Sequence, residues 1–285
     1  MIPAGFDYTR PDSIDGVTAA LRDGGEDAKI LAGGQSLVPL LRLRLAYPSV
    51  LVDLSGVAEM QGVRDDGDAI VIGAMTTHYA VLNDPLVREH AALLALATGT
   101  VADPAVRHRG TFGGSLAHGD PAGDLPAVAL AYGAQMVIAG SGGRRTVAAA
   151  DFFQDYLQTA VGPDEVLVEV RVPKLGPGWG HAYEKFHRTA QAWALVGVAA
   201  LVHRSNGSIT EARVGLTNMG TTPLRAAATE AALVGADASA GAVANAAGQA
   251  AEGTTPSSDL HAGSDYREHL ARVLTRRAVS AAAGV

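Results

Sequence analysis

Cysteine is absent from the 285 residues of this chain. Its absence excludes disulfides, thiolate zinc sites, a cysteine nucleophile and any iron–sulfur cluster ligated by this chain. Long apolar runs are missing as well: the most apolar one covers the ten residues 193–202, whereas a membrane-spanning helix needs roughly 20. The N-terminal residues show no secretory signal pattern. We therefore expect a cytoplasmic protein without a membrane span.

Positively charged residues are fewer than negatively charged ones. Lys and Arg number 22 against 29 Asp and Glu, which leaves a net charge of −7. We expect no nucleic-acid binding, because phosphate contacts need clustered cations. The sequence also lacks a P-loop, a G-x-G-x-x-G fingerprint, a G-x-S-x-G elbow and an H-E-x-x-H motif. Its nine His include no pair four residues apart, so we expect no metal site.

Apolar residues make up 48% of the chain, which is enough for a buried core and excludes intrinsic disorder. Apolar, β-branched runs predict strands at 27–32, 50–54, 69–75 and 165–172. Helical spacing and capping residues predict helices at 37–45, 84–97 and 125–132. Glycine-rich turns predict hairpins around 140–143 and 205–207. The Ala-rich chain beyond Pro223 predicts helices, the last at 265–283.

The segment Pro173 to Gly180 holds two Pro and three Gly and is the best candidate for a domain boundary. The predicted elements before and after it mix helices with strands, so the expected fold class is α+β. For the part after the boundary we expect an antiparallel sheet with terminal helices.

Two glycine loops stand out, at Ala32 to Leu37 (AGGQSL) and at Arg109 to Pro121 (RGTFGGSLAHGDP). Each pairs a Gly-Gly with a nearby Ser or Thr. Glycine lets the backbone approach a ligand closely, and successive N–H groups can then bind an anion. Two such loops make a pyrophosphate-containing ligand plausible. The alternative is that each Gly-Gly merely forms a tight turn.

These loops resemble those of the FAD-binding medium subunits of molybdenum hydroxylases, the xanthine dehydrogenase superfamily. The resemblance covers nearly the whole chain, and the two loops lie about 75 residues apart in the family's order. The stretches MIPAGFDYTRPDSI, VIGAMTTH, YEKFHRTAQAWALVGVAALV and GLTN are most similar to the aerobic carbon monoxide dehydrogenase group.

The resemblance implies an architecture. Residues 1–177 would form a two-lobed FAD-binding domain of the p-cresol methylhydroxylase and vanillyl-alcohol oxidase type, with lobes at about 1–55 and 56–177. Residues 178–285 would form the smaller flavoprotein C-terminal domain.

The resemblance also implies roles for individual residues in binding FAD. The pyrophosphate would be held by Ala32, Gly33, Gly34, Gln35, Ser36, Leu37, Gly110, Thr111, Gly113, Gly114 and Ser115. The flavin side of the cleft would be lined by Ala102, Asp103 and Val106. The ribityl chain would be contacted by residues among His118, Gly119, Asp120 and Asp124. For Asp120 and Asp124 the alternatives are a turn and a helix cap.

Three further residues carry open alternatives. Lys185 would reach the cofactor, or would be a solvent-exposed strand residue. Leu167 would pack on the flavin or adenine, or would simply belong to the core. Trp193 would stack on the isoalloxazine or gate access of the electron acceptor, or would be a core residue that opens a strand.

Two positions depart from the carbon monoxide dehydrogenase group. Gln35 stands where that group carries His, although Gln is common elsewhere in the superfamily. Because loop contacts to pyrophosphate are mostly made by backbone, we expect FAD binding to survive, while the assignment of the substrate is weakened. The stretch Thr189 to Ala192 is also less basic than expected, which weakens the gate interpretation of Trp193.

The implied function is electron transfer, with no catalytic residue on this chain. A large partner would carry the molybdenum cofactor and a small partner two [2Fe–2S] clusters. FAD here would pass electrons to a quinone or another acceptor, in a dimer of heterotrimers. The substrate would be carbon monoxide. The alternatives are a purine, aldehyde or N-heterocycle hydroxylase, a stand-alone FAD oxidase, or a flavin-free interaction subunit.

Overall fold

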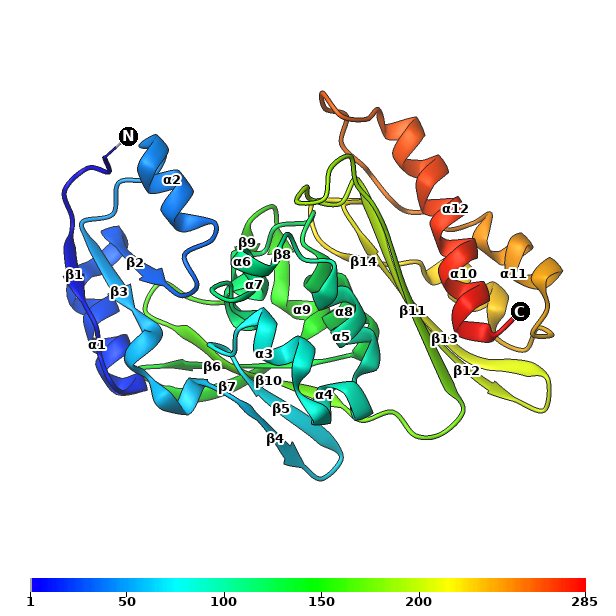
Figure 1. The fold of residues 1–285 in the computed structure, drawn as a ribbon, viewed down its shortest axis with the longest axis horizontal. Coiled ribbons are helices and arrows are strands. Elements are labelled where there is room, and N and C mark those ends of the chain that lie inside the picture. Colours follow the sequence, from blue (N-terminus) through cyan, green and yellow to red (C-terminus); the bar gives the residue numbers. More distant parts are fainter. Residues whose placement is uncertain (1) are drawn as a thin grey trace.

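The computed structural model describes residues 2–285. The N-terminal part is a parallel sheet of order β1-β3-β2 with two helices (Figure 1). Its elements are β1 (Asp7–Thr9), α1 (Ile14–Gly24), β2 (Ala28–Leu31), α2 (Leu37–Leu43) and β3 (Val50–Asp53), with short 3-10 turns at Gly25–Asp27, Leu54–Gly56 and Ala58–Met60. The predicted order of strand, glycine loop and helix is confirmed. α2 ends earlier than expected, because Arg44 adopts a left-handed backbone, φ 57°.

The middle part is an antiparallel sheet of order β4-β5-β10-β6-β7 covered by short helices. Its strands are β4 (Val63–Asp66), β5 (Ala69–Gly73), β6 (Gln135–Gly140), β7 (Gly143–Ala148) and β10 (Val166–Pro173), with the small pair β8 (Phe153–Asp155) and β9 (Gln158–Thr159) beside it. Its helices are α3 (His78–Asn83), α4 (Pro85–His90), α5 (Ala92–Gly99), α6 (Pro104–Arg107), α7 (Phe112–His118), α8 (Asp124–Tyr132) and α9 (Ala149–Phe152). The predicted strands and the first hairpin are confirmed.

The single helix expected over 84–97 is wrong. Asp84 does cap the helix that Pro85 begins, since its carboxylate accepts a hydrogen bond from the Leu86 N–H at 2.9 Å. The helix breaks at the fully buried Ala91, whose φ of −138° and ψ of 48° lie outside the helical region. The break separates α4 from α5, whose apolar side chains Leu93 and Leu94 are buried in the core.

The C-terminal part is an antiparallel sheet of order β11-β12-β13-β14 followed by helices. Its elements are β11 (Trp179–Phe186), β12 (Val196–Ser205), β13 (Ser208–Thr217), β14 (Leu224–Arg225), α10 (Ala227–Leu233), α11 (Ala240–Ala247) and α12 (Ser264–Ala283). The predicted hairpin and last helix are confirmed.

β12 is buried on both faces, which explains the long apolar run around it. Ala199 and Leu201 belong to a hydrophobic cluster shared with the middle part, while Val198 and Val202 belong to a second cluster formed with the C-terminal helices. α8 accordingly packs against β12 and β13, and α12 covers β11 and β12 (Figure 1). Within residues 2–285, no helix is both long and apolar enough to cross a membrane.

Candidate cofactor site

The two glycine loops lie in direct contact. A Cβ atom on Gly33 would overlap the carbonyl oxygen of Arg109 and would lie 2.6 Å from the Gly110 Cα. A Cβ on Gly114 would lie 3.3 Å from the Ala32 side chain. Glycine at position 33 is therefore required for the loop after β2 to touch the loop before α7. The two loops, residues 32–37 and 109–121, therefore form one continuous wall of the candidate site, although they lie far apart in the sequence.

The first loop offers backbone donors without acceptors. Among residues 2–285, the N–H groups of Gly34, Gln35 and Ser36 donate no hydrogen bond. Gly34 has a left-handed backbone, φ 73°. Ser36 precedes α2, but its side chain does not cap the helix, so its hydroxyl is also available. Consecutive free N–H groups can bind an anion.

The second loop differs, because most of its donors are used inside the protein. The N–H groups of Phe112 and Gly113 donate to the carbonyls of Thr76 and Ala74, both at 2.9 Å. Thr111 caps α7, its hydroxyl accepting a hydrogen bond from the Gly114 N–H at 3.1 Å. The loop is thus fixed to the end of β5 and forms a rigid side of the wall. Its Ser115 lies half-buried at the surface of this wall.

His78 packs against the second glycine loop at Gly110. Its sequence context alone did not predict this role. Its backbone N–H donates to the Gly110 carbonyl at 2.9 Å, and its ring lies under Gly110. The side chain is buried, and no hydrogen-bond partner faces its Nδ1 atom within the described chain. Burial, assisted by the charge of Arg107, lowers the pKa of His78 to about 4. Its sequence signal was the TTH of the stretch VIGAMTTH.

The segment before the second loop is tied to a distant part of the chain. Ala102 has a left-handed backbone, φ 41°, which is uncommon for a residue with a Cβ. Asp103 caps α6 by accepting from the Val106 N–H at 2.8 Å. Its other carboxylate oxygen accepts a hydrogen bond from Gln191. The structure therefore brings the chain that leads to Trp193 beside the segment predicted to line the flavin side.

The segment after the second loop forms a tight turn. α7 ends at His118, and Gly119 follows in a left-handed conformation, φ 64°. Asp120 accepts a hydrogen bond from the Ala122 N–H at 2.8 Å, so the turn expected at this residue is present. His118 Nε2 lies 3.9 Å from an Asp120 carboxylate oxygen. This turn carries the chain into α8.

Asp124, Lys185 and Tyr183 form a buried polar network. Lys185 Nζ lies 2.8 Å from Asp124 Oδ2, with both side chains 4% exposed, and also donates to the Thr100 carbonyl at 3.1 Å. Tyr183 donates to Asp124 Oδ1 at 2.6 Å. The alternative of a solvent-exposed Lys185 is therefore wrong. The cap alternative for Asp124 is wrong too, because Gly123 occupies the cap position and the carboxylate binds Tyr183 and Lys185.

The ionisation of this network reflects its burial. Burial raises the pKa of Asp124, while the charge of Lys185 and its hydrogen bond oppose that rise. Burial also raises the pKa of Tyr183 well above its usual value, with the Asp124 charge acting in the same direction. The phenol thus stays protonated and serves as a hydrogen-bond donor to the carboxylate.

The two apolar candidates lie in opposite surroundings. Leu167 is buried in β10 as part of the core. Trp193 is 53% exposed and precedes β12, so the alternative of a core tryptophan is wrong. An exposed indole is available for stacking on a ligand.

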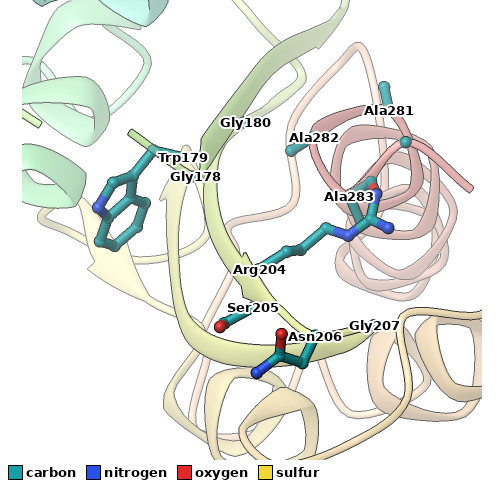
Figure 2. A pocket seen from close by; sticks show the side chains of 11 residues that line it. Gly178, Trp179, Gly180, Arg204, Ser205, Asn206, Gly207, Ala281, Ala282 and Ala283 are labelled. Atoms are coloured by element: carbon teal, nitrogen blue, oxygen red, sulfur yellow. The ribbon is translucent and has the colours of Figure 1, made fainter. Parts of the chain in front are cut away.

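A separate surface hollow of about 440 Å³ lies on the C-terminal part (Figure 2). It is lined by Trp179, Arg204, Asn206 and the end of α12. The Arg204 guanidinium is already hydrogen-bonded to the Ala283 carbonyl. None of the residues predicted from the sequence to bind a cofactor lines this hollow, so the glycine loops remain the candidate site.

Two known families match this chain, one over its N-terminal and middle parts and the other over its C-terminal part. Residues 4–175 match the family described as FAD binding domain in molybdopterin dehydrogenase. Residues 181–282 match the CO dehydrogenase flavoprotein C-terminal domain.

The comparisons with individual proteins cover the full length. The carbon monoxide dehydrogenase medium chain of Hydrogenophaga pseudoflava is 41% identical, over 99% of this chain and 98% of that protein. A solved carbon monoxide dehydrogenase structure from the same organism superimposes with a TM-score of 0.97, at 43% identity and covering 99% and 98% of the two chains. The structure of quinoline 2-oxidoreductase from Pseudomonas putida 86 superimposes with a TM-score of 0.95, at 38% identity and covering 100% and 99% of the two chains. The chain therefore belongs to the family of FAD-binding medium subunits of molybdenum hydroxylases.

Proposed function

We propose that this chain is the FAD-carrying electron-transfer subunit of a molybdenum hydroxylase that oxidises carbon monoxide to carbon dioxide. The observation that carries the proposal is the contact between the two glycine loops beside the free N–H groups of Gly34, Gln35 and Ser36. Full-length similarity to carbon monoxide dehydrogenase medium chains supports the choice of substrate.

The residues present fit FAD. The pyrophosphate carries negative charge and would be held by the free backbone donors of Gly34 to Ser36 and by the Ser36 hydroxyl. The loop after Arg109, which touches the first loop at Gly33, would form the other side of the same wall. The bound flavin would supply the redox chemistry, accepting electrons and passing them on.

The chain's own polar residues would orient the flavin. We propose that Asp124 accepts hydrogen bonds from ribityl hydroxyls, because its position in the first turn of α8 directly follows the turn at Asp120. Lys185 donates to Asp124 and to Thr100, so one of its three N–H groups is left for the cofactor. Ala102, Asp103 and Val106 would line the flavin side, and Trp193 would lie against the isoalloxazine or control access of the acceptor. No proton transfer is assigned to this chain.

Partner subunits are part of the proposal. The chain has no cysteine, so the two [2Fe–2S] clusters would belong to a small partner and the molybdenum cofactor to a large one. Exposed apolar side chains gather on and beside α2, which follows the first glycine loop: Val38, Leu40, Leu43, Leu45 and Tyr47. Apolar surface of this kind is typical of subunit contacts. We further propose a dimer of heterotrimers in the cytoplasm, with a quinone or similar molecule as acceptor.

A second substrate class has support of its own. The likeness to quinoline 2-oxidoreductase favours an N-heterocycle hydroxylase as the alternative. The residues of the candidate site do not select between carbon monoxide and such a heterocycle, because the proposed substrate pocket would lie on the large partner. The medium subunit would perform the same electron transfer in both cases.

The test is an absorption spectrum of the complex purified through a tag on this chain, with chromatography of the released cofactors. Flavin bands, released FAD and iron–sulfur absorbance from two co-purifying chains are expected. Bleaching of the spectrum by carbon monoxide, and not by quinoline, would establish the substrate. A colourless solitary chain that takes up no added FAD would overturn the proposal. A yellow solitary chain that consumes oxygen with a phenol would identify an oxidase instead.

A further inference from the structure

The stretch Gly215-Leu216-Thr217-Asn218 ends β13 beside the start of α8. A Cβ on Gly215 would overlap the Ala127 carbonyl oxygen, so glycine permits the close approach of the helix to the strand. The fully buried Thr217 donates from its hydroxyl to the Gly123 carbonyl at 3.4 Å. This end of the sheet is therefore fitted to the segment that the second glycine loop leads into.

Asn218 connects two segments that are remote from each other in the sequence. Its backbone N–H donates to the Pro121 carbonyl at 2.8 Å, and its side-chain Nδ2 donates to the Ala194 carbonyl, also at 2.8 Å. The residue adopts a left-handed backbone, φ 62°. Asparagine tolerates this conformation better than most residues, although it is still uncommon outside glycine. The unusual conformation accompanies both hydrogen bonds.

The two connected segments are parts of the candidate site. Pro121 directly follows Asp120, in the turn between the second glycine loop and α8. Ala194 directly follows Trp193, whose side chain is half-exposed. The next residue, Leu195, is also held, since its N–H donates to the Phe186 carbonyl at 2.8 Å and its carbonyl accepts from Arg267 at 2.5 Å. The backbone after Trp193 is thus fixed while its indole remains accessible.

We propose that Asn218 is a positioning residue that holds the Trp193 segment at a fixed position relative to the turn at Pro121. This inference rests on the proposed function, in which that turn leads to the ribityl-binding Asp124 and Trp193 lies against the isoalloxazine or controls access of the acceptor. Asn218 acts through the Ala194 carbonyl and touches no part of the cofactor itself. Its amide would thereby set the position of the indole at the candidate site.

The test uses full-length chains in a Trp179→Phe background, which leaves Trp193 as the single tryptophan. Asn218→Gly keeps the left-handed backbone accessible and removes the donor to Ala194, and Asn218→Asp replaces that donor by an acceptor. Asn206→Gly is the matched control. Asn206 has the same left-handed backbone, φ 51°, in the turn at the other end of the β12–β13 hairpin, beside the hollow of Figure 2.

Three quantities are measured: the fluorescence anisotropy of Trp193 without FAD, its quenching by bound FAD, and the FAD content. Both Asn218 variants lose the hydrogen bond to the Ala194 carbonyl. The fraction of molecules in which Trp193 is displaced should therefore rise about fivefold, as expected for the loss of one hydrogen bond. Anisotropy and quenching by FAD should then fall, whereas FAD content should stay close to that of the Asn206→Gly control.

A purely structural role would lower the melting temperature and leave the Trp193 signals like those of the control, and this result would overturn the inference. Equal signals in Asn218→Gly and Asn206→Gly would have the same consequence. Failure of the proposed function is distinguishable, because the parent chain itself would then take up no FAD. The anisotropy measured without FAD would still decide whether Asn218 holds the Trp193 segment.

Discussion

Lys185 and Asp124 form a buried ion pair at 2.8 Å that joins β11 to the first turn of α8. Each side chain is 4% exposed, so neither charge is solvated by bulk water. The pair is completed by the Tyr183 hydroxyl on the carboxylate and the Thr100 carbonyl on the ammonium. Removing one partner from such a pair leaves a buried charge without compensation.

The first prediction follows from this burial. Lys185→Met should lower the free energy of unfolding of the FAD-free chain by about 3–5 kcal/mol, since Asp124 keeps its charge or must bind a proton. Lys174→Met is the control, because Lys174 pairs with Asp65 at 2.6 Å but Asp65 is 52% exposed. The control should lose less than about 1 kcal/mol. Urea unfolding measures both, and equal losses would contradict the prediction.

The second prediction concerns the contact between the glycine loops. Gly33→Ala places a Cβ against Arg109 and Gly110 and should push the loops apart. Overpacking of this kind costs about 1–3 kcal/mol, and where this cost falls on the loop geometry that binds FAD the affinity should drop about 5- to 150-fold. Gly142→Ala is the matched control, since no atom lies within 4 Å of the position that its Cβ would take. FAD titration of both variants decides, and an unchanged affinity in Gly33→Ala would exclude the loop contact as part of the site.

The third prediction is a pH dependence that originates at His78. Burial holds its pKa at about 4 in the folded chain, against 6.5 as the ordinary value. The unfolded chain therefore binds more protons between these two pH values, and stability falls as the pH drops from 6.5 towards 4. The full contribution is about 3 kcal/mol.

His78→Gln removes this titration. Urea unfolding of the parent and the variant at pH 6.5 and pH 4.5 should show a smaller acid loss in the variant, although the variant starts from a lower stability. Parallel losses in the two chains would mean that His78 is not the group responsible. The loop at Gly110 is expected to loosen first, because its carbonyl accepts from the His78 backbone.

Local patterns predicted most of the elements, since periodicity and capping depend on neighbouring residues. The strand before Gly33, the hairpin at Asn206 and the last helix were predicted in this way and confirmed. The break at Ala91 was missed, because Asp84-Pro85 signals where a helix begins but nothing local signals that break. Packing around the fully buried Ala91 decides it.

The burial and hydrogen bonding of the site residues could not be predicted from local patterns, because they depend on contacts between distant segments. Lys185 meets Asp124 across 61 positions, and no spacing rule connects a strand lysine to a helix of another part of the chain. Trp193 sits at the start of an apolar run that suggested the core, yet it precedes the strand and is exposed. The role of Asn218 could be found only from the structure, because its partners Pro121 and Ala194 come from separate segments.

The fourth prediction addresses Gln35, for which the resemblance to the carbon monoxide dehydrogenase group led us to expect His. The Gln35 side chain is exposed and donates to the Gly33 carbonyl at 3.0 Å, so it braces the loop. The proposed pyrophosphate donors are backbone N–H groups, which a change of side chain leaves in place. Gln35→His and Gln35→Ala should therefore change the Kd for FAD by less than about threefold, as expected for an exposed hydrogen bond.

Titration of the apo-chain with FAD measures this effect, with Gly33→Ala as the variant that must lose affinity in the same assay. A tenfold loss in Gln35→Ala would show that the side chain itself holds the cofactor or that the loop collapses without its brace. If no Gln35 variant changes the Kd for FAD, the identity of this residue carries no information about FAD binding. The substrate must then be assigned by measurements on the whole complex.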